Sequence, residues 1–209
     1  MKRIIVAITV MMFFLGCASQ VRRFHEEAVD GKTYQYDNLM GKANIIFKSQ
    51  GKGNDVDTEI YIKRPDNLRL DIFMPFVGNA ARIIMKGDKA ILYDFFHNEI
   101  IIPENNSNKL FEDIIGIQID TKILMDLLLF AYISPENPTL NQKIHLSDNS
   151  FAIYNSVDLD FPPEIMYFMT DKGDTVRIEY KELFLEREID DEIFDAPKMK
   201  NADTLRLVN

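Results

Sequence analysis

The sequence contains 209 residues, of which 46% are hydrophobic and 27% are charged, with one cysteine and no tryptophan. This length favours one compact domain with a substantial core, and the composition excludes a disordered or collagen-like chain. The formal net charge of −9 argues against a nucleic-acid partner, because neutralising phosphates requires clustered Lys and Arg. A single cysteine can form neither an intramolecular disulfide nor a multi-thiolate metal site.

The N-terminal segment differs from the rest of the chain. Lys2 and Arg3 form a short basic region, and residues 4–15 form an apolar run. A helix of this length rises about 18 Å, which is too short for a hydrocarbon core of roughly 30 Å. The segment is therefore typical of a secretory signal peptide.

The apolar run ends in Phe14-Leu15-Gly16-Cys17, which resembles the lipobox of bacterial lipoproteins. The resemblance implies cleavage after residue 16 and acyl groups on Cys17 as a membrane anchor. Ser19, where an aspartate would favour the inner membrane, favours the outer membrane. Loss of Lys2 and Arg3 would change the net charge to −11, so acyl chains rather than charge would hold the protein at the membrane. The alternative is an ordinary signal peptide with an incidental cysteine.

Three regions follow from these patterns: the signal peptide at 1–16, a lipidated tether with a short helix at 17–40, and a β-rich domain at 41–209. Alternating apolar residues predict strands in the last region. The predicted strands span 43–48, 58–63, 68–72, 81–86, 90–95, 99–102, 142–146, 151–154, 165–170 and 175–180. Turns are predicted at 51–55, 87–88 and 171–174, and helices from Ser107 to Gly116 and from Asp120 to Ala131. The fold class is therefore mainly β, with an antiparallel sheet curling partly around a helix.

Catalytic and metal-binding patterns are sparse. His25, His97 and His145 are far apart in the sequence, and no nucleophile elbow, Walker loop or dinucleotide fingerprint is present. We therefore expect no enzymatic activity, no metal and no cofactor beyond the acyl groups and a possible bound lipid.

The segment Met74-Pro75-Phe76-Val77-Gly78 joins two predicted strands with large apolar residues, where turns usually carry polar ones. Two interpretations stay open at this point. The loop either folds onto the core or forms an exposed apolar patch suited to a membrane surface or an acyl chain.

The chain from about Gly41 to its end resembles the LolA/LolB superfamily of lipoprotein carriers. The lipidated start and the turn that carries Phe76 are similar to LolB, the outer-membrane receptor, whereas Lys63-Arg64-Pro65 and the segment 193–197 are closer to LolA, the soluble carrier. The segments that carry the resemblance are Ile62-Lys63-Arg64-Pro65-Asp66, Leu68-Arg69-Leu70-Asp71, Pro75-Phe76-Val77-Gly78 and 110–128.

The resemblance implies an unclosed antiparallel β-barrel with helices covering its mouth and a cavity for acyl chains. It further implies that Arg64 contacts the lid helices and that Met74, Phe76 and Val77 form a membrane or cargo loop. The cavity-lining residues it implies are Ile60, Ile62, Leu68, Leu70, Ile72, Ile83, Met85 and Leu92, with Phe111 and Ile115 on the lid.

The function implied is that of an outer-membrane receptor and insertion factor, facing the periplasm. It would be a monomer that accepts acylated lipoproteins from a periplasmic LolA-like carrier. Two alternatives remain: a lipid or glycolipid carrier on the same scaffold, and an envelope lipoprotein that only scaffolds partners.

Overall fold

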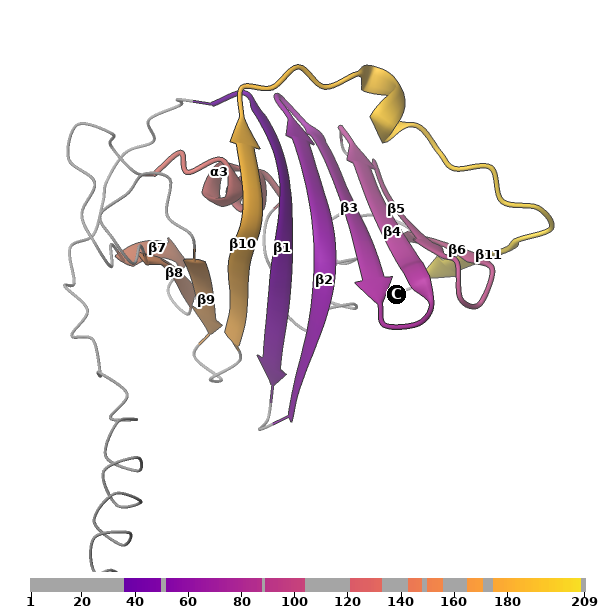
Figure 1. The fold of residues 1–209 in the computed structure, drawn as a ribbon, viewed down its shortest axis with the longest axis horizontal. Coiled ribbons are helices and arrows are strands. Elements are labelled where there is room, and N and C mark those ends of the chain that lie inside the picture. Colours follow the sequence, from indigo (N-terminus) through magenta and orange to yellow (C-terminus); the bar gives the residue numbers. More distant parts are fainter. Residues whose placement is uncertain are drawn as a thin grey trace, which may run out of the picture.

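The structure is a computed structural model that describes residues 36–49, 52–87, 89–103, 121–132, 143–147, 150–155, 165–170 and 175–207 (Figure 1). It contains one α-helix in these residues, α3 (Thr121–Leu128), and a 3₁₀ turn, η1 (Asp191–Phe194). The strands are β1 (Asn38–Ser49), β2 (Lys52–Lys63), β3 (Asn67–Met74), β4 (Gly78–Lys86), β5 (Lys89–Asp94), β6 (Glu99–Pro103), β7 (Lys143–Ser147), β8 (Ser150–Asn155), β9 (Ile165–Thr170), β10 (Thr175–Leu185) and β11 (Asp203–Leu207).

The eleven strands form one sheet in the order β11-β6-β5-β4-β3-β2-β1-β10-β9-β8-β7. Every neighbouring pair is antiparallel except β11 and β6, which run parallel. Among the described strands, β11 and β7 are each paired on one side only, so the sheet is not closed. The predicted mainly β fold class with an unclosed antiparallel barrel is confirmed; of the helices predicted to cover its mouth, the described residues contain α3.

One face of the sheet, here called the inner face, carries the core. Leu68 and Leu70 of β3 point to this face and are buried, while Arg69 and Asp71, which alternate with them, point to the other, outer face. This arrangement follows from the period of two in a strand. Helix α3 packs against the inner face, which gives the apolar side chains of both elements a common interior (Figure 1).

The first hairpin is longer than the alternation predicts. β1 begins at Asn38, before the predicted start at Ala43, and β2 begins at Lys52, so the turn predicted over 51–55 is wrong. Gly53 pairs with Lys48 across the ladder, and a Cβ at Gly53 would lie 3.2 Å from the carbonyl oxygen of Phe47. The ladder continues through polar, solvent-exposed residues because backbone hydrogen bonds need no apolar side chains.

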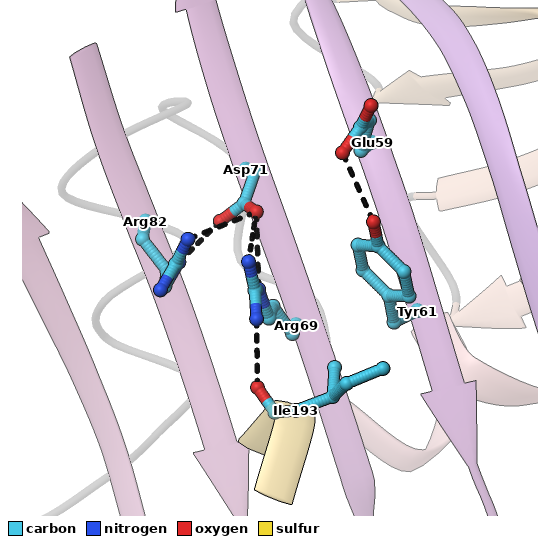
Figure 2. Close-up of polar contacts among 6 residues, drawn as sticks. All are labelled: Glu59, Tyr61, Arg69, Asp71, Arg82 and Ile193. Atoms are coloured by element: carbon cyan, nitrogen blue, oxygen red, sulfur yellow. Dashed lines mark hydrogen bonds and ion pairs between the residues drawn. The ribbon is translucent and has the colours of Figure 1, made fainter. Parts of the chain in front are cut away.

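The C-terminal segment crosses the outer face after β10 and ends in β11, neither of which the sequence patterns predict. Asp71, only 2% exposed, accepts hydrogen bonds from the guanidinium groups of Arg69 and Arg82. Arg69 also donates through Nη1 to the carbonyl oxygen of Ile193 in η1, at 2.9 Å (Figure 2). Because the three charged side chains satisfy one another, they hold η1 on the sheet without an unpaired buried charge.

The helix predicted over 107–116, the lid residues Phe111 and Ile115, and the whole N-terminal region up to residue 35 with Cys17 lie outside the described residues.

Candidate functional site

The residues expected to line a cavity lie together on the inner face. All but one belong to one buried cluster, and the remaining residue, Ile72, is half-buried and packs against it. The buried members are Ile60, Ile62, Leu68, Leu70, Ile83, Met85 and Leu92. They come from four adjacent strands, β2 to β5, whose registers align the apolar positions in transverse rows. Burying each such side chain contributes about 1.5–3 kcal/mol, so this wall is a main part of the core.

Helix α3 covers part of this wall. Its buried residues include Leu124, Met125, Leu127 and Leu128, and they belong to the same apolar cluster as the strands. The chain then turns through Phe130, which is fully buried and adopts a φ of 55°. The apolar residues of the stretch 123–130 therefore pack into this cluster.

Two polar contacts attach α3 to the sheet. Arg64, in the turn between β2 and β3, donates from Nη2 to Oδ1 of Asp126 at 2.9 Å, and the Asp126 side chain is 6% exposed. On the other side, the buried hydroxyl of Tyr154 donates to the carbonyl oxygen of Leu127 at 2.6 Å. Burial raises the pKa of Tyr154 well above its ordinary value, so its hydroxyl stays a donor. These contacts fix the position of α3 from both sides.

Two buried hydroxyl groups interrupt the apolar wall. Thr58 of β2 and Tyr180 of β10 both pair with Ala43 of β1, so they lie in one transverse row across three strands. Within the part of the chain that the structure describes, neither the Oγ1 atom of Thr58 nor the hydroxyl of Tyr180 has a hydrogen-bond partner. Burial raises the pKa of Tyr180 above its ordinary range. An unsatisfied buried hydroxyl costs about 1–3 kcal/mol, so each of these two groups is less favourable at its position than the apolar side chains around it.

The loop between β3 and β4 is exposed, which decides between the two interpretations left open by the sequence. Phe76 has a relative exposure of 109%, and Met74 and Val77 on either side are about half exposed. The loop is a tight turn in which the backbone N–H of Val77 donates to the carbonyl oxygen of Met74 at 3.3 Å. The turn connects two strands of the apolar wall, so an exposed apolar tip continues directly from a buried apolar surface.

The backbone at the tip is unusual for a bulky residue. Phe76 has a φ of 67°, in the left-handed region that glycine, asparagine and aspartate normally occupy. Pro75 before it and the positive φ at the third turn position are typical of a type II turn. Neither the core nor backbone preference explains a phenylalanine at this position, which makes it a candidate contact residue.

The structure shows no sign of a metal centre or a membrane-crossing helix in the residues it describes. It has no group of three or more His, Cys, Asp or Glu side chains placed to hold a metal ion. None of its helices there is long and apolar enough to cross a bilayer.

Sequence reasoning missed two residues near this site. Asp126 is an acidic residue within an apolar helix, and its spacing gives no hint that it meets Arg64, 62 residues earlier. Phe96, in the loop between β5 and β6, is 63% exposed and directly follows a second phenylalanine, Phe95. The first could have been suspected from a charge on an apolar helix face, and the second from two large apolar residues in a turn.

The fold and site together define a class of protein: an open antiparallel sheet with an apolar inner face, a helix against that face, and an exposed apolar hairpin tip. No family model matches the chain, and no curated protein matches it.

Solved structures do match. A DUF1329 family protein from Desulfovibrio piger superimposes with a TM-score of 0.52 at 10% identity, covering 77% of this chain and 90% of the other. A LolA superfamily protein from Nitrosomonas europaea superimposes with a TM-score of 0.48 at 12% identity, and the match covers 78% of this chain and 92% of the other. A provisionally named outer membrane lipoprotein-sorting protein domain from Vibrio parahaemolyticus superimposes with a TM-score of 0.47 at 9% identity. The match covers 78% of this chain and 91% of the other. At these identities the similarity concerns the fold.

Proposed function

We propose that this chain is an outer-membrane lipoprotein that receives acylated lipoproteins from a periplasmic carrier and inserts them into the membrane. The observation that carries the proposal is the exposed Phe76 at the tip of a hairpin whose strands form the apolar wall. The resemblance of the sequence to the LolA/LolB superfamily supports the same function. The acyl anchor on Cys17 and the LolB-like role both belong to this proposal.

Transfer on this surface needs no covalent chemistry, and we propose that the protein is not an enzyme. Each buried methylene group contributes about 0.8 kcal/mol, so an acyl chain moves to whichever partner buries more of it. The inner face provides that burial, and the exposed tip provides a route from it to the membrane. Arg64 and Asp126 hold α3 at one side of the wall during this exchange.

Depletion of the protein in its bacterial host tests the proposal. We expect lipoproteins to accumulate in the periplasm, bound to their carrier, and native mass spectrometry of the purified protein to show acylated cargo. Normal lipoprotein sorting after depletion would overturn the receptor function. Bound lipid together with normal sorting would instead support a lipid or glycolipid carrier, and a core that never holds cargo would support a scaffold.

Complementation with point variants makes the test specific. Phe76→Glu should fold normally, because the side chain is fully exposed, yet fail to restore sorting. Phe184→Glu is the matched control, since Phe184 is an exposed phenylalanine near the opposite end of the sheet. A loss of stability in Phe76→Glu would show that Phe76 belongs to the core.

A further inference from the structure

A second exposed apolar loop projects from the same end of the sheet as the Phe76 turn. The β3–β4 turn leaves the sheet where Met74 pairs with Gly78, at the start of β4. The loop between β5 and β6, residues 95–98, leaves it on the other side of β4, where the N–H of Phe95 donates to the carbonyl oxygen of Ala80 at 2.9 Å. Figure 1 shows both loops projecting from the lower edge of the sheet in that view. The two loops therefore lie at the same end of the sheet, on either side of β4, although Phe76 and Phe96 are twenty positions apart in the sequence.

The β5–β6 loop is constructed so that Phe96 points outward. One carboxylate, that of Asp94, accepts hydrogen bonds from the N–H of Phe96 at 2.9 Å, the N–H of His97 at 3.0 Å and the imidazole Nδ1 of His97 at 2.7 Å. On the far side, the side chain of Asn98 donates to the carbonyl oxygen of Asn201 at 3.0 Å. The Phe96 side chain is 63% exposed, and its ring packs edge-to-face with the His97 ring, with centroids 4.9 Å apart. Because the loop is already ordered, inserting Phe96 into a partner costs little additional entropy.

The exposed side chains of the two loops suit the interfacial zone of a bilayer. Phe76, Phe96, Met74 and Val77 are apolar and stand at the tips of turns, so they can enter a lipid surface without burying the sheet edge. Their insertion is favourable because it removes apolar area from water. A net negative chain gains little from anionic lipids, which leaves hydrophobic insertion as the attractive force.

The expected lipid anchor is compatible with this orientation. β1 begins at Asn38, opposite Lys63 of β2, and so at the end of the sheet remote from the two loops. The segment from Cys17 to Tyr36 can span at most about 65 Å when extended. A strand of the length of β1 spans roughly 40 Å. An anchor at Cys17 can therefore reach past the sheet and allow the loop end to face the membrane.

We infer that Phe96 and the Met74–Val77 tip together form a two-loop surface that docks this end of the sheet on a lipid bilayer. The inference rests on the proposed function, to which it adds a second contact and a defined orientation. Two contacts restrict the orientation of the sheet on the membrane more than a single inserted residue does. The end of the apolar wall at the β3–β4 and β5–β6 connections would then face the bilayer.

The absence of tryptophan from the chain provides a direct test. Phe76→Trp, Phe96→Trp and the control Phe184→Trp each introduce a single fluorophore that replaces an exposed aromatic residue. The full lipidated chain is reconstituted with phosphatidylcholine vesicles that contain brominated acyl chains. We expect blue-shifted emission and bromine quenching for Phe76→Trp and Phe96→Trp, whereas Phe184→Trp should remain quenched by aqueous iodide.

A binding measurement supplies the magnitude. In the mature chain, which begins at position 17 without the apolar run 4–15 and carries Cys17→Ser so that it cannot be acylated, Phe96→Ser should weaken binding to phosphatidylcholine vesicles about tenfold, and Phe184→Ser should not. The inference is overturned if the tryptophan at position 96 stays accessible to iodide while that at 76 is quenched by lipid. It is also overturned if both are shielded by a carrier protein but not by vesicles. Because a chain that docks on vesicles can still fail to restore lipoprotein sorting, failure of the proposed function is recognised separately.

Discussion

Replacing Asp71 by asparagine tests how much the outer-face charge cluster contributes to stability. The side chain keeps its shape but loses the negative charge that Arg69 and Arg82 share, and it accepts four hydrogen bonds from them in the native protein. Charge-assisted hydrogen bonds contribute about 1.5–3 kcal/mol each, but desolvation of the carboxylate offsets part of this sum. Since Asp71 is 2% exposed, we expect Asp71→Asn to lower the free energy of unfolding by about 3–5 kcal/mol. Urea denaturation followed by circular dichroism measures this value, with the m-value checking that the unfolding transition is unchanged.

The matched control is Asp57→Asn. Asp57 forms an ion pair with Lys181 at 2.5 Å, but both side chains are more than half exposed. Solvent screens such a pair, so the change should lie within about 0.5 kcal/mol of the wild type. If Asp71→Asn costs no more than Asp57→Asn, the reasoning from burial is refuted. If the cluster acts as a unit, replacing Asp71 by leucine together with both arginines by methionine should recover much of the loss.

Two further predictions concern the helix contact and a surface histidine. Arg64→Leu should loosen α3, because it removes a hydrogen-bond donor from the nearly buried Asp126. We expect the free energy of unfolding to fall by about 1–3 kcal/mol and the α3 amides to exchange hydrogen faster. Unchanged exchange would contradict the assignment. The hydrogen bond and charge of Asp94 raise the pKa of His97 above its ordinary value. The stabilisation from this pair is therefore fully present below the unfolded-state pKa of about 6.5 and is lost as pH rises through the folded-state pKa. An NMR titration should show the pKa of His97 returning to its ordinary value in Asp94→Asn, and an identical titration curve in the two proteins would be the contrary result.

The sequence predicted the strands of the sheet better than its connections. Alternation placed Leu68 and Leu70 on one face and Arg69 on the other, because that pattern is a local property of each strand. The predicted strand at 165–170 has the bounds of β9. The start of β2 was missed because its first residues are polar and exposed, while their pairing with β1 depends on the partner strand.

The candidate site was predictable in part. The apolar wall followed from the same alternation, and the odd composition of the Met74–Gly78 turn identified the tip. Its exposure could not be deduced, since an apolar loop can equally fold onto a core. The position of Phe96 beside this tip depends on the registers of β3, β4 and β5, which no short segment encodes.

The sequence by itself determined which side chains share a face and that a signal-like segment precedes a single cysteine. These features depend on residues within a few positions of one another. Only the tertiary structure decided that Asp126 meets Arg64, that the C-terminal segment returns as β11 parallel to β6, and that two apolar loops project from one end of the sheet. Each of these depends on bringing together residues that are distant in the chain, and burial of the whole apolar surface, rather than any local preference, selects that arrangement.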